Sequence, residues 1–190
     1  VIVFASDHGD YLGDHGLIGK GSFYESSTHI PLLVNLPNRK TATASDDLVT
    51  LTDVTATLLQ LAGCPLPEYM DSRPLRGIGH EGDAWAPRDV LIGMNQSGWM
   101  LFDGTWKLSK YANGEATLFN LEEDPDEIRN RIGDPGCADR LIEMDRRLTA
   151  EVMQSIAFAN REKAVDLDNT LWSDPRYGME GREREYPREV

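Results

Sequence analysis

The sequence has few cysteines, little positive charge and no long hydrophobic run. Only Cys64 and Cys137 occur among its 190 residues, and their spacing fits neither a metal site nor a disulfide framework. The longest apolar stretches, residues 1–5 and 30–34, are far too short to cross a bilayer. We therefore expect no membrane span and no thiolate-based metal site.

Negative charge outweighs positive charge. The chain has 19 Lys and Arg residues against 32 Asp and Glu residues, which gives a formal net charge of -13. Such a surface repels nucleic acid and anionic membranes. It also repels an anionic substrate unless a local cation reverses the sign at the site. With 40% hydrophobic residues, the chain is nevertheless expected to fold as a globular protein.

The first part of the chain has the pattern of an α/β protein. Residues 1–5 form a β-branched and aromatic run, which predicts a strand buried on both faces in a parallel sheet. Residues 30–36 predict a second strand. Residues 46–63 predict a helix, with Thr52 or Asp53 as its N-terminal cap and Gly63 at its end. Residues 65–87, rich in proline, glycine and charge, are expected to be a surface connection.

The second part predicts a small antiparallel sheet followed by a helix. Asp103-Gly104 and Asn113-Gly114 are typical of tight hairpin turns between strands. We expect about four strands, and a final helix whose apolar residues recur at helical spacing. The expected strands are residues 90–93, 99–102, 106–111 and 117–121, the helix is 138–160, and residues 172–190 form an extended arm.

Candidate chemistry is concentrated just after the first strand. Asp7 and His8 follow residues 1–5 closely, at the edge of an α/β sheet where ligands bind. A carboxylate beside an imidazole offers two metal ligands, although a solvated turn is the more common role of such a pair. Lys20 lies between Gly19 and Gly21, and its compact ammonium is suited to an oxyanion.

Several blocks resemble the sulfatase family of the alkaline phosphatase superfamily. Residues 3–25 (VFASDHGDYLGDHGLIGKGSFYE) and 28–34 (THIPLLV) carry the resemblance most closely. Residues 51–54 (LTDV) and 58–63 (LLQLAG) resemble the following helix of the family. Residues 106–108 (WKL), 118–125 (LFNLEEDP) and Glu127 resemble its C-terminal hairpin and acidic segment. The resemblance implies an α/β fold that is the C-terminal part of an alkaline-phosphatase-like sandwich.

The resemblance also implies a division of the chain. Residues 1–64 would be the C-terminal part of the catalytic α/β domain, and residues 65–88 a connecting loop. Residues 89–160 would form a subdomain of antiparallel sheet and helix, and residues 161–190 an extended tail.

Roles in the site are implied residue by residue. Asp7 resembles a ligand of the active-site divalent cation, and His8 occupies the adjacent ligand position. Calcium is the expected metal, with manganese as the alternative because His8 offers nitrogen. Lys20 resembles the lysine that contacts the sulfate group and the nucleophile, and His15 is a candidate substrate contact.

The chain departs from the family because three of its features are absent: the nucleophile motif, the early Asp pair that completes the metal shell, and the upstream Lys and His residues around the leaving group. Sulfatases carry a Cys or Ser in a C/S-x-P-x-R motif that is converted to formylglycine, but Cys64 and Cys137 begin no such motif. We expect formylglycine in a missing N-terminal half, read Val1 as a cut, and expect little or no catalysis by the isolated chain. A strand without neighbours would also favour homo-oligomers.

Three functions remain open at this point. The first is hydrolysis of a small-molecule or glycan sulfate ester. The second is hydrolysis of a phosphonate or phosphate ester within the same superfamily. The third is a non-catalytic C-terminal module.

Overall fold

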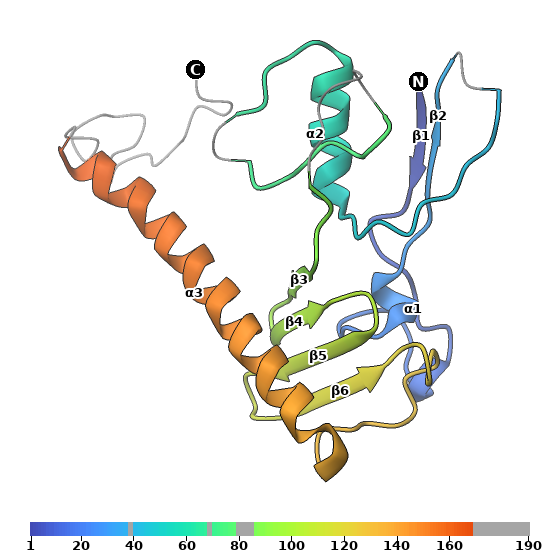
Figure 1. Ribbon diagram of the computed structural model, residues 1–190, viewed down its shortest axis with the longest axis vertical. Coiled ribbons are helices and arrows are strands. Elements are labelled where there is room, and N and C mark those ends of the chain that lie inside the picture. The colour runs from blue at the N-terminus through green and yellow to red at the C-terminus, as the bar shows by residue number, and fades with distance from the viewer. Residues whose placement is uncertain (38–39, 68–69, 79–85, 169–190) are drawn as a thin grey trace. The chain divides into compact units, whose positions relative to one another are not determined.

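The structure is a computed structural model that describes residues 1–37, 40–67, 70–78 and 86–168 (Figure 1). The contacts within the chain divide it into two units, Val1–Asp145 and Arg146–Val190, so the boundary falls inside the last helix. The expected arm over residues 172–190 lies outside the described residues. No described helix is long and apolar enough to span a membrane.

The strands of the first unit form two antiparallel sheets (Figure 1). Strand β1 (Ile2–Ala5) pairs with β2 (Leu32–Asn35), with Ile2 opposite Asn35. The other sheet has four strands in sequence order. These are β3 (Leu91–Met94), β4 (Gly98–Phe102), β5 (Trp106–Tyr111) and β6 (Ala116–Asn120). The expected sheet of four antiparallel strands is confirmed.

Strand β1 corrects our expectation of a doubly buried strand in a parallel sheet. Its one partner among the described residues is β2, which runs antiparallel to it. Ile2 is 67% exposed and Phe4 is 59% exposed. The apolar composition was read correctly as a strand, but no described part of the chain covers these two side chains.

The hairpin turns of the four-stranded sheet follow the sequence signals. Gly104 and Gly114 have φ angles of 97° and 90°, which glycine adopts without steric cost. Asp103 reinforces its turn, because its Oδ1 accepts hydrogen bonds from the backbone N–H groups of Thr105 and Trp106. The buried apolar side chains of this sheet are Met100, Leu101, Leu108, Leu118 and Phe119.

Helix α2 (Leu51–Leu61) is shorter than the predicted helix. Its N-terminal cap is Thr50, which corrects the choice of Thr52 or Asp53. Asp53 lies in the first turn instead, and its Oδ2 accepts a hydrogen bond from the Thr50 N–H at 2.8 Å. Gly63, with a φ of 71°, ends the helix as expected.

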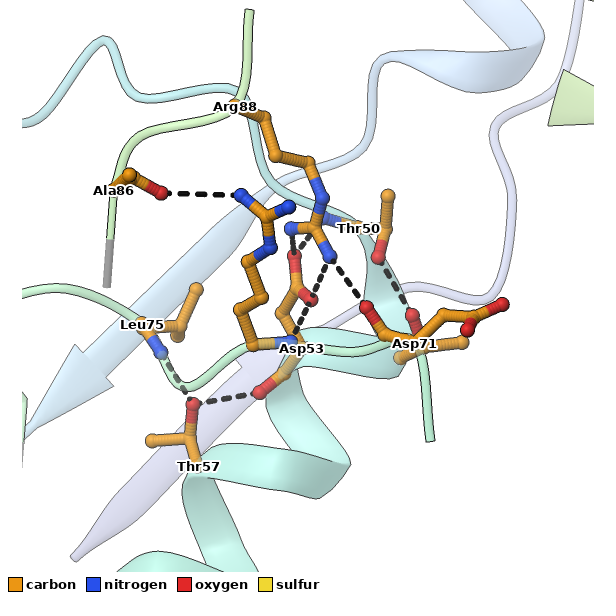
Figure 2. Close-up of polar contacts among 9 residues, drawn as sticks. Thr50, Asp53, Thr57, Asp71, Leu75, Ala86 and Arg88 are labelled. Carbon is orange, nitrogen blue, oxygen red and sulfur yellow. Dashed lines mark hydrogen bonds and ion pairs between the residues drawn. The ribbon is translucent and has the colours of Figure 1, made fainter. Parts of the chain in front are cut away.

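The connection after α2 is anchored, not merely a surface loop (Figure 2). Arg88 donates from both terminal guanidinium nitrogens to the buried Asp53 carboxylate. The Arg73 N–H also donates to Asp53, at 2.8 Å, and the Leu75 N–H donates to Thr57 Oγ1 at 2.8 Å. Ser72 and Leu75 are buried in this connection. A carboxylate removed from water in α2 needs these partners, which sequence periodicity does not reveal.

The final helix α3 (Ala138–Asp168) extends beyond the predicted end at Asn160, so residues 161–168 are helical and not part of an extended tail. It follows the short 3-10 helix η2 (Pro135–Cys137), which Asp134 caps by accepting a hydrogen bond from the Gly136 N–H at 2.9 Å. Near the start of α3, Arg140 forms an ion pair with Asp103. This ion pair attaches the beginning of the helix to the turn between β4 and β5.

Candidate functional site

The turn after β1 is seated on the short helix α1 (Glu25–Thr28). The Gly9 N–H donates to the Ser27 carbonyl oxygen at 2.9 Å. A Cβ on Gly9 would lie 2.0 Å from the carbonyl oxygen of Ser26, so only glycine permits this approach. Ser6 Oγ donates to the His8 carbonyl oxygen at 2.7 Å. The backbone that carries Asp7 and His8 is therefore fixed at both ends.

Asp7 and His8 are brought together in the turn. His8 Nδ1 lies 2.7 Å from the Gly9 carbonyl oxygen, which can only accept, so Nδ1 carries a proton. The other ring nitrogen, Nε2, lies 3.3 Å from Asp7 Oδ2. These two atoms are close enough together for one metal ion to contact both. The Asp7 side chain is 81% exposed, which leaves its carboxylate accessible to such an ion.

These two donors fit part of a metal site. The described residues contain no group of three or more His, Cys, Asp or Glu side chains placed to hold a metal ion. Calcium takes about 6–8 oxygen ligands, so Asp7 and His8 cannot complete its shell. The hydrogen bond from His8 Nδ1 to a carbonyl oxygen is the arrangement that orients an imidazole ligand in metal sites.

Lys20 lies on a loop whose backbone is tightly held. Gly19 and Gly21, on either side, have φ angles of 82° and 143°. The Gly19 carbonyl oxygen accepts from the Tyr11 N–H at 2.9 Å, and that of Gly21 accepts from Asn95 Nδ2 at 2.9 Å. The Lys20 side chain is exposed and makes no ion pair within the described part of the chain. Its ammonium is thus free to meet an anion.

His15 occupies a different position, in the 3-10 helix η1 (Asp14–Gly16). Its ring stacks on Tyr24, with 3.7 Å between the centroids and 9° between the planes. Asp10 shapes the same loop, because its Oδ1 accepts from the N–H groups of Leu12 and Gly19. No bond joins Lys20 or His15 to Asp7 or His8 among the described residues, so the structure brings together one pair of the four.

A buried ion cluster, which sequence reasoning did not identify, lies behind α1. Lys107 on β5 is 1% exposed, and its Nζ lies 2.8 Å from Glu25 Oε1 and 2.6 Å from Glu127 Oε1. Glu127 is also buried, and its Oε2 accepts from the Glu25 N–H at 2.6 Å. Burial raises the pKa of Glu127, and the adjacent Lys107 opposes that rise.

The three members of the cluster are far apart in the sequence, and a lysine in a strand is usually exposed. Each lies in a block that resembles the sulfatase family, which was the one available signal. The resemblance does not explain why these three residues occur, whereas the structure shows that they form ion pairs with one another.

Sequence reasoning also passed over a serine motif. Residues 72–76 read Ser-Arg-Pro-Leu-Arg, which fits S-x-P-x-R. The structure places Ser72 in the anchored connection, where it is buried and its hydroxyl has no partner among the described residues. It belongs to the anchor on α2, and no bond links it to the turn of Asp7 and His8 in the part of the chain that is described.

Sequence comparison identifies relatives of known type. The model of the family described as "N-sulphoglucosamine sulphohydrolase, C-terminal" matches residues 13–91. Arylsulfatase K of Xenopus laevis is 32% identical over 167 residues, which cover 80% of this chain and 31% of that protein. An arylsulfatase of Clostridium perfringens is 29% identical over 162 residues, covering 80% and 33%.

Solved structures share the fold. A 2-O GAG sulfatase aligns with a TM-score of 0.70 at 24% identity, over 80% of this chain and 36% of that one. A protein solved with its substrate D-glucosamine-2-N,6-O-disulfate aligns with a TM-score of 0.64 at 23% identity, over 80% and 34%. The phosphonate monoester hydrolase of Silicibacter pomeroyi has a TM-score of 0.69 at 26% identity, over 80% and 34%.

The chain spans about a third of the length of the relatives it matches. The sulfatase family in general suggests a divalent metal and formylglycine, and the donors of Asp7 and His8 are compatible with the first of these. The family model, the arylsulfatase relatives and the shared fold agree with one another. This chain belongs to the sulfatase family of the alkaline phosphatase superfamily and corresponds to the C-terminal portion of its members.

Proposed function

We propose that the protein containing this chain hydrolyses sulfate esters, and that the chain supplies part of the metal and anion site. The observation that carries the proposal is the pairing of His8 Nε2 with Asp7 Oδ2 in a turn fixed on α1. Lys20 follows on a loop held by hydrogen bonds, with its ammonium unpaired in the described structure. Asp7 and His8 are the proposed metal ligands and Lys20 the proposed sulfate contact.

The proposed chemistry of this chain is electrostatic. A bound divalent cation would supply positive charge beside the transferring sulfate group. Lys20 would hold a sulfate oxygen through its ammonium and neutralise charge that develops there in the transition state. The glycines on both sides keep the lysine backbone free of side chains that obstruct an approaching ligand. His15, stacked on Tyr24, is the proposed second substrate contact.

Calcium is the metal that we propose, because Asp7 offers a hard carboxylate oxygen. The nitrogen of His8 also suits manganese. The nucleophile is proposed to be a formylglycine contributed by a part of the protein outside this chain. Ser72 is excluded from that role in our proposal because its hydroxyl is buried.

The substrate that we propose is a small-molecule or glycan sulfate ester. Support for a glycan comes from the family description, which names sulphoglucosamine, and from the disulfated glucosamine bound by one structural neighbour. An acidic chain would admit such an anion through the local charge of the metal and Lys20.

The activity is tested by assaying the full-length protein with an aryl sulfate and calcium. We expect turnover that is lost in Lys20→Met and Asp7→Asn and retained in Ser72→Ala. The isolated chain should be inactive. Equal turnover by the isolated chain, or loss of activity in Ser72→Ala, would show that the nucleophile has been misplaced.

Hydrolysis of a phosphonate or phosphate ester is the second candidate. It is favoured by the nitrogen ligand His8 and by the fold shared with a phosphonate monoester hydrolase. Comparing kcat/KM on an aryl sulfate and an aryl phosphonate, with the same full-length protein, decides between the two. A higher value on the phosphonate would replace our first proposal with the second.

A further inference from the structure

We propose that Lys107, Glu25 and Glu127 are positioning residues that link the four-stranded sheet to the turn of Asp7 and His8 through α1. This buried ion cluster contacts neither proposed ligand, so its influence would pass through the backbone of α1. The catalytic part of this inference rests on the proposed function, whereas the structural link does not.

The first link joins the sheet to α1. Lys107 comes from β5 and Glu127 from the segment after β6, and both are nearly inaccessible to water. Glu25 is the first residue of α1, and both its side chain and its backbone N–H are bound by the other two residues. A helix of four residues has little stability of its own. The cluster therefore determines where α1 begins and how it is oriented.

The second link joins α1 to the turn. The Gly9 N–H bonds to Ser27, and the Gly9 backbone packs against the Ser26 carbonyl oxygen with no space for a side chain. Tyr24 precedes α1, and the centroid of its ring lies 6.0 Å from the ring centroid of Phe119 on β6. A shift of α1 would therefore move Gly9, and with it the carbonyl oxygen that holds His8 Nδ1 at 2.7 Å.

The loop of Lys20 is attached to the same segment. Tyr11 Oη donates to Ser22 Oγ at 2.7 Å and accepts a hydrogen bond from the Ser22 N–H. Ser22 lies three positions before Glu25 in the sequence. The cluster is thus connected to both candidate parts of the site. These are the turn with the proposed metal ligands and the loop with Lys20.

A second buried ion pair in the chain provides a matched control. Asp53 is 1% exposed and Arg88 is 17% exposed, and this pair anchors the connection of residues 70–78 to α2 (Figure 2). Among the described residues, neither is bonded to the segment of residues 6–29. Breaking this pair should therefore lower stability without disturbing the turn.

The test compares Lys107→Met with Arg88→Met in the full-length protein. Each variant is studied at the same interval below its own melting temperature. Differences in exchange between the two variants then do not arise from a difference in overall stability. Amide hydrogen exchange should become faster over residues 7–29 in Lys107→Met and stay unchanged there in Arg88→Met. Calcium affinity, titrated with calcium chloride alone, should fall about tenfold in Lys107→Met, and Lys107→Arg should restore most of it.

Glu127→Gln is the second variant, and it tests the same inference if Lys107→Met does not fold. It removes one charge, retains an oxygen that can accept from the Glu25 N–H, and should give a smaller change in the same direction. Unchanged exchange over residues 7–29 in variants that are clearly destabilised would overturn the link. Faster exchange with no sulfatase activity in the wild-type protein would instead support the link and contradict the proposed function.

Discussion

At the scale of single residues, the tightest steric constraint near the site is at Gly9. A Cβ there would meet the carbonyl oxygen of Ser26 at 2.0 Å, and a backbone oxygen cannot move aside as a flexible side chain does. We expect Gly9→Ala to reduce the free energy of unfolding by about 1–3 kcal/mol, as overpacking commonly does. Urea denaturation measures this change.

The matched control is Gly133→Ala. A Cβ added at Gly133 would meet no atom of the described residues within 4 Å, and the backbone there does not adopt a positive φ. We expect a change of less than about 0.5 kcal/mol at this position. Equal losses at the two glycines would mean that the turn is not seated on α1.

The His8 side chain carries a prediction about metal choice. Replacing its imidazole nitrogen with an amide oxygen, in His8→Asn, should weaken manganese binding more than calcium binding, because calcium prefers oxygen ligands. Titration of the full-length protein with each ion measures the two affinities. A parallel loss for both ions would indicate that His8 does not contact the metal.

Glu127 carries a prediction about pH. Its pKa is raised in the folded state, chiefly by burial, so the folded protein holds this proton more tightly than the unfolded chain does. Its contribution to stability is then fully present below the ordinary glutamate pKa of about 4.3 and is lost as the pH rises through the raised value. Lys107 limits this loss of stability, because its positive charge favours the ionised form of Glu127 and lowers the pKa.

Stability should therefore fall in the wild-type protein relative to Glu127→Gln as the pH rises from about 4 to about 8. Urea unfolding of both proteins at several pH values measures the difference. A difference that changes in the opposite direction would show that the ion pair with Lys107 outweighs burial.

At the scale of elements, α2 and the connection after it depend on a buried ion pair. Arg88→Met would leave the Asp53 carboxylate buried without its main partner, which costs about 3–5 kcal/mol for pairs of this kind. Arg76→Met removes a much more exposed pair with Asp47 and should cost about 0–1 kcal/mol. Similar losses in thermal unfolding for both variants would contradict the anchoring role of Asp53.

The elements differ in how well the sequence predicts them. The hairpins around Gly104 and Gly114 were predictable because a turn is specified by residues next to one another. The cap at Thr50 was missed by two or three positions, since several neighbouring residues can accept a hydrogen bond there. The partners of Lys107 were not predictable, because Glu25 and Glu127 both lie far from it in the sequence and only folding brings them to β5.

The candidate site shows the same division. Asp7, His8 and Lys20 were identified from local context and from the resemblance to sulfatases. The hydrogen bond that fixes the turn on α1 joins the Gly9 N–H to the Ser27 carbonyl oxygen, and no periodicity of the sequence marks such a contact. The residues that support the site could therefore be identified only from the structure, whereas its candidate ligands could be identified from the sequence.

At the scale of the whole molecule, the exposed face of β1 and β2 predicts self-association of the isolated chain. Ile2, Phe4 and Leu33 are large, apolar and exposed on paired strands, and such surfaces are prone to association. Size-exclusion chromatography should show species larger than 21.2 kDa. Phe4→Lys should reduce them, whereas Ile128→Lys, at an exposed position in another segment, should not. A sharp monomer peak for the unmodified chain would contradict this prediction.

The central claim is the proposal that Asp7 and His8 bind a cation and that Lys20 binds the anion beside it. Anomalous diffraction from crystals of the full-length protein, grown with manganese and sulfate, tests it most directly. We predict an anomalous peak about 2–2.6 Å from both the Asp7 carboxylate and His8 Nε2, with a sulfate oxygen about 2.7–2.9 Å from Lys20 Nζ. A cation bound elsewhere, or a Lys20 side chain directed away from it, would contradict the account.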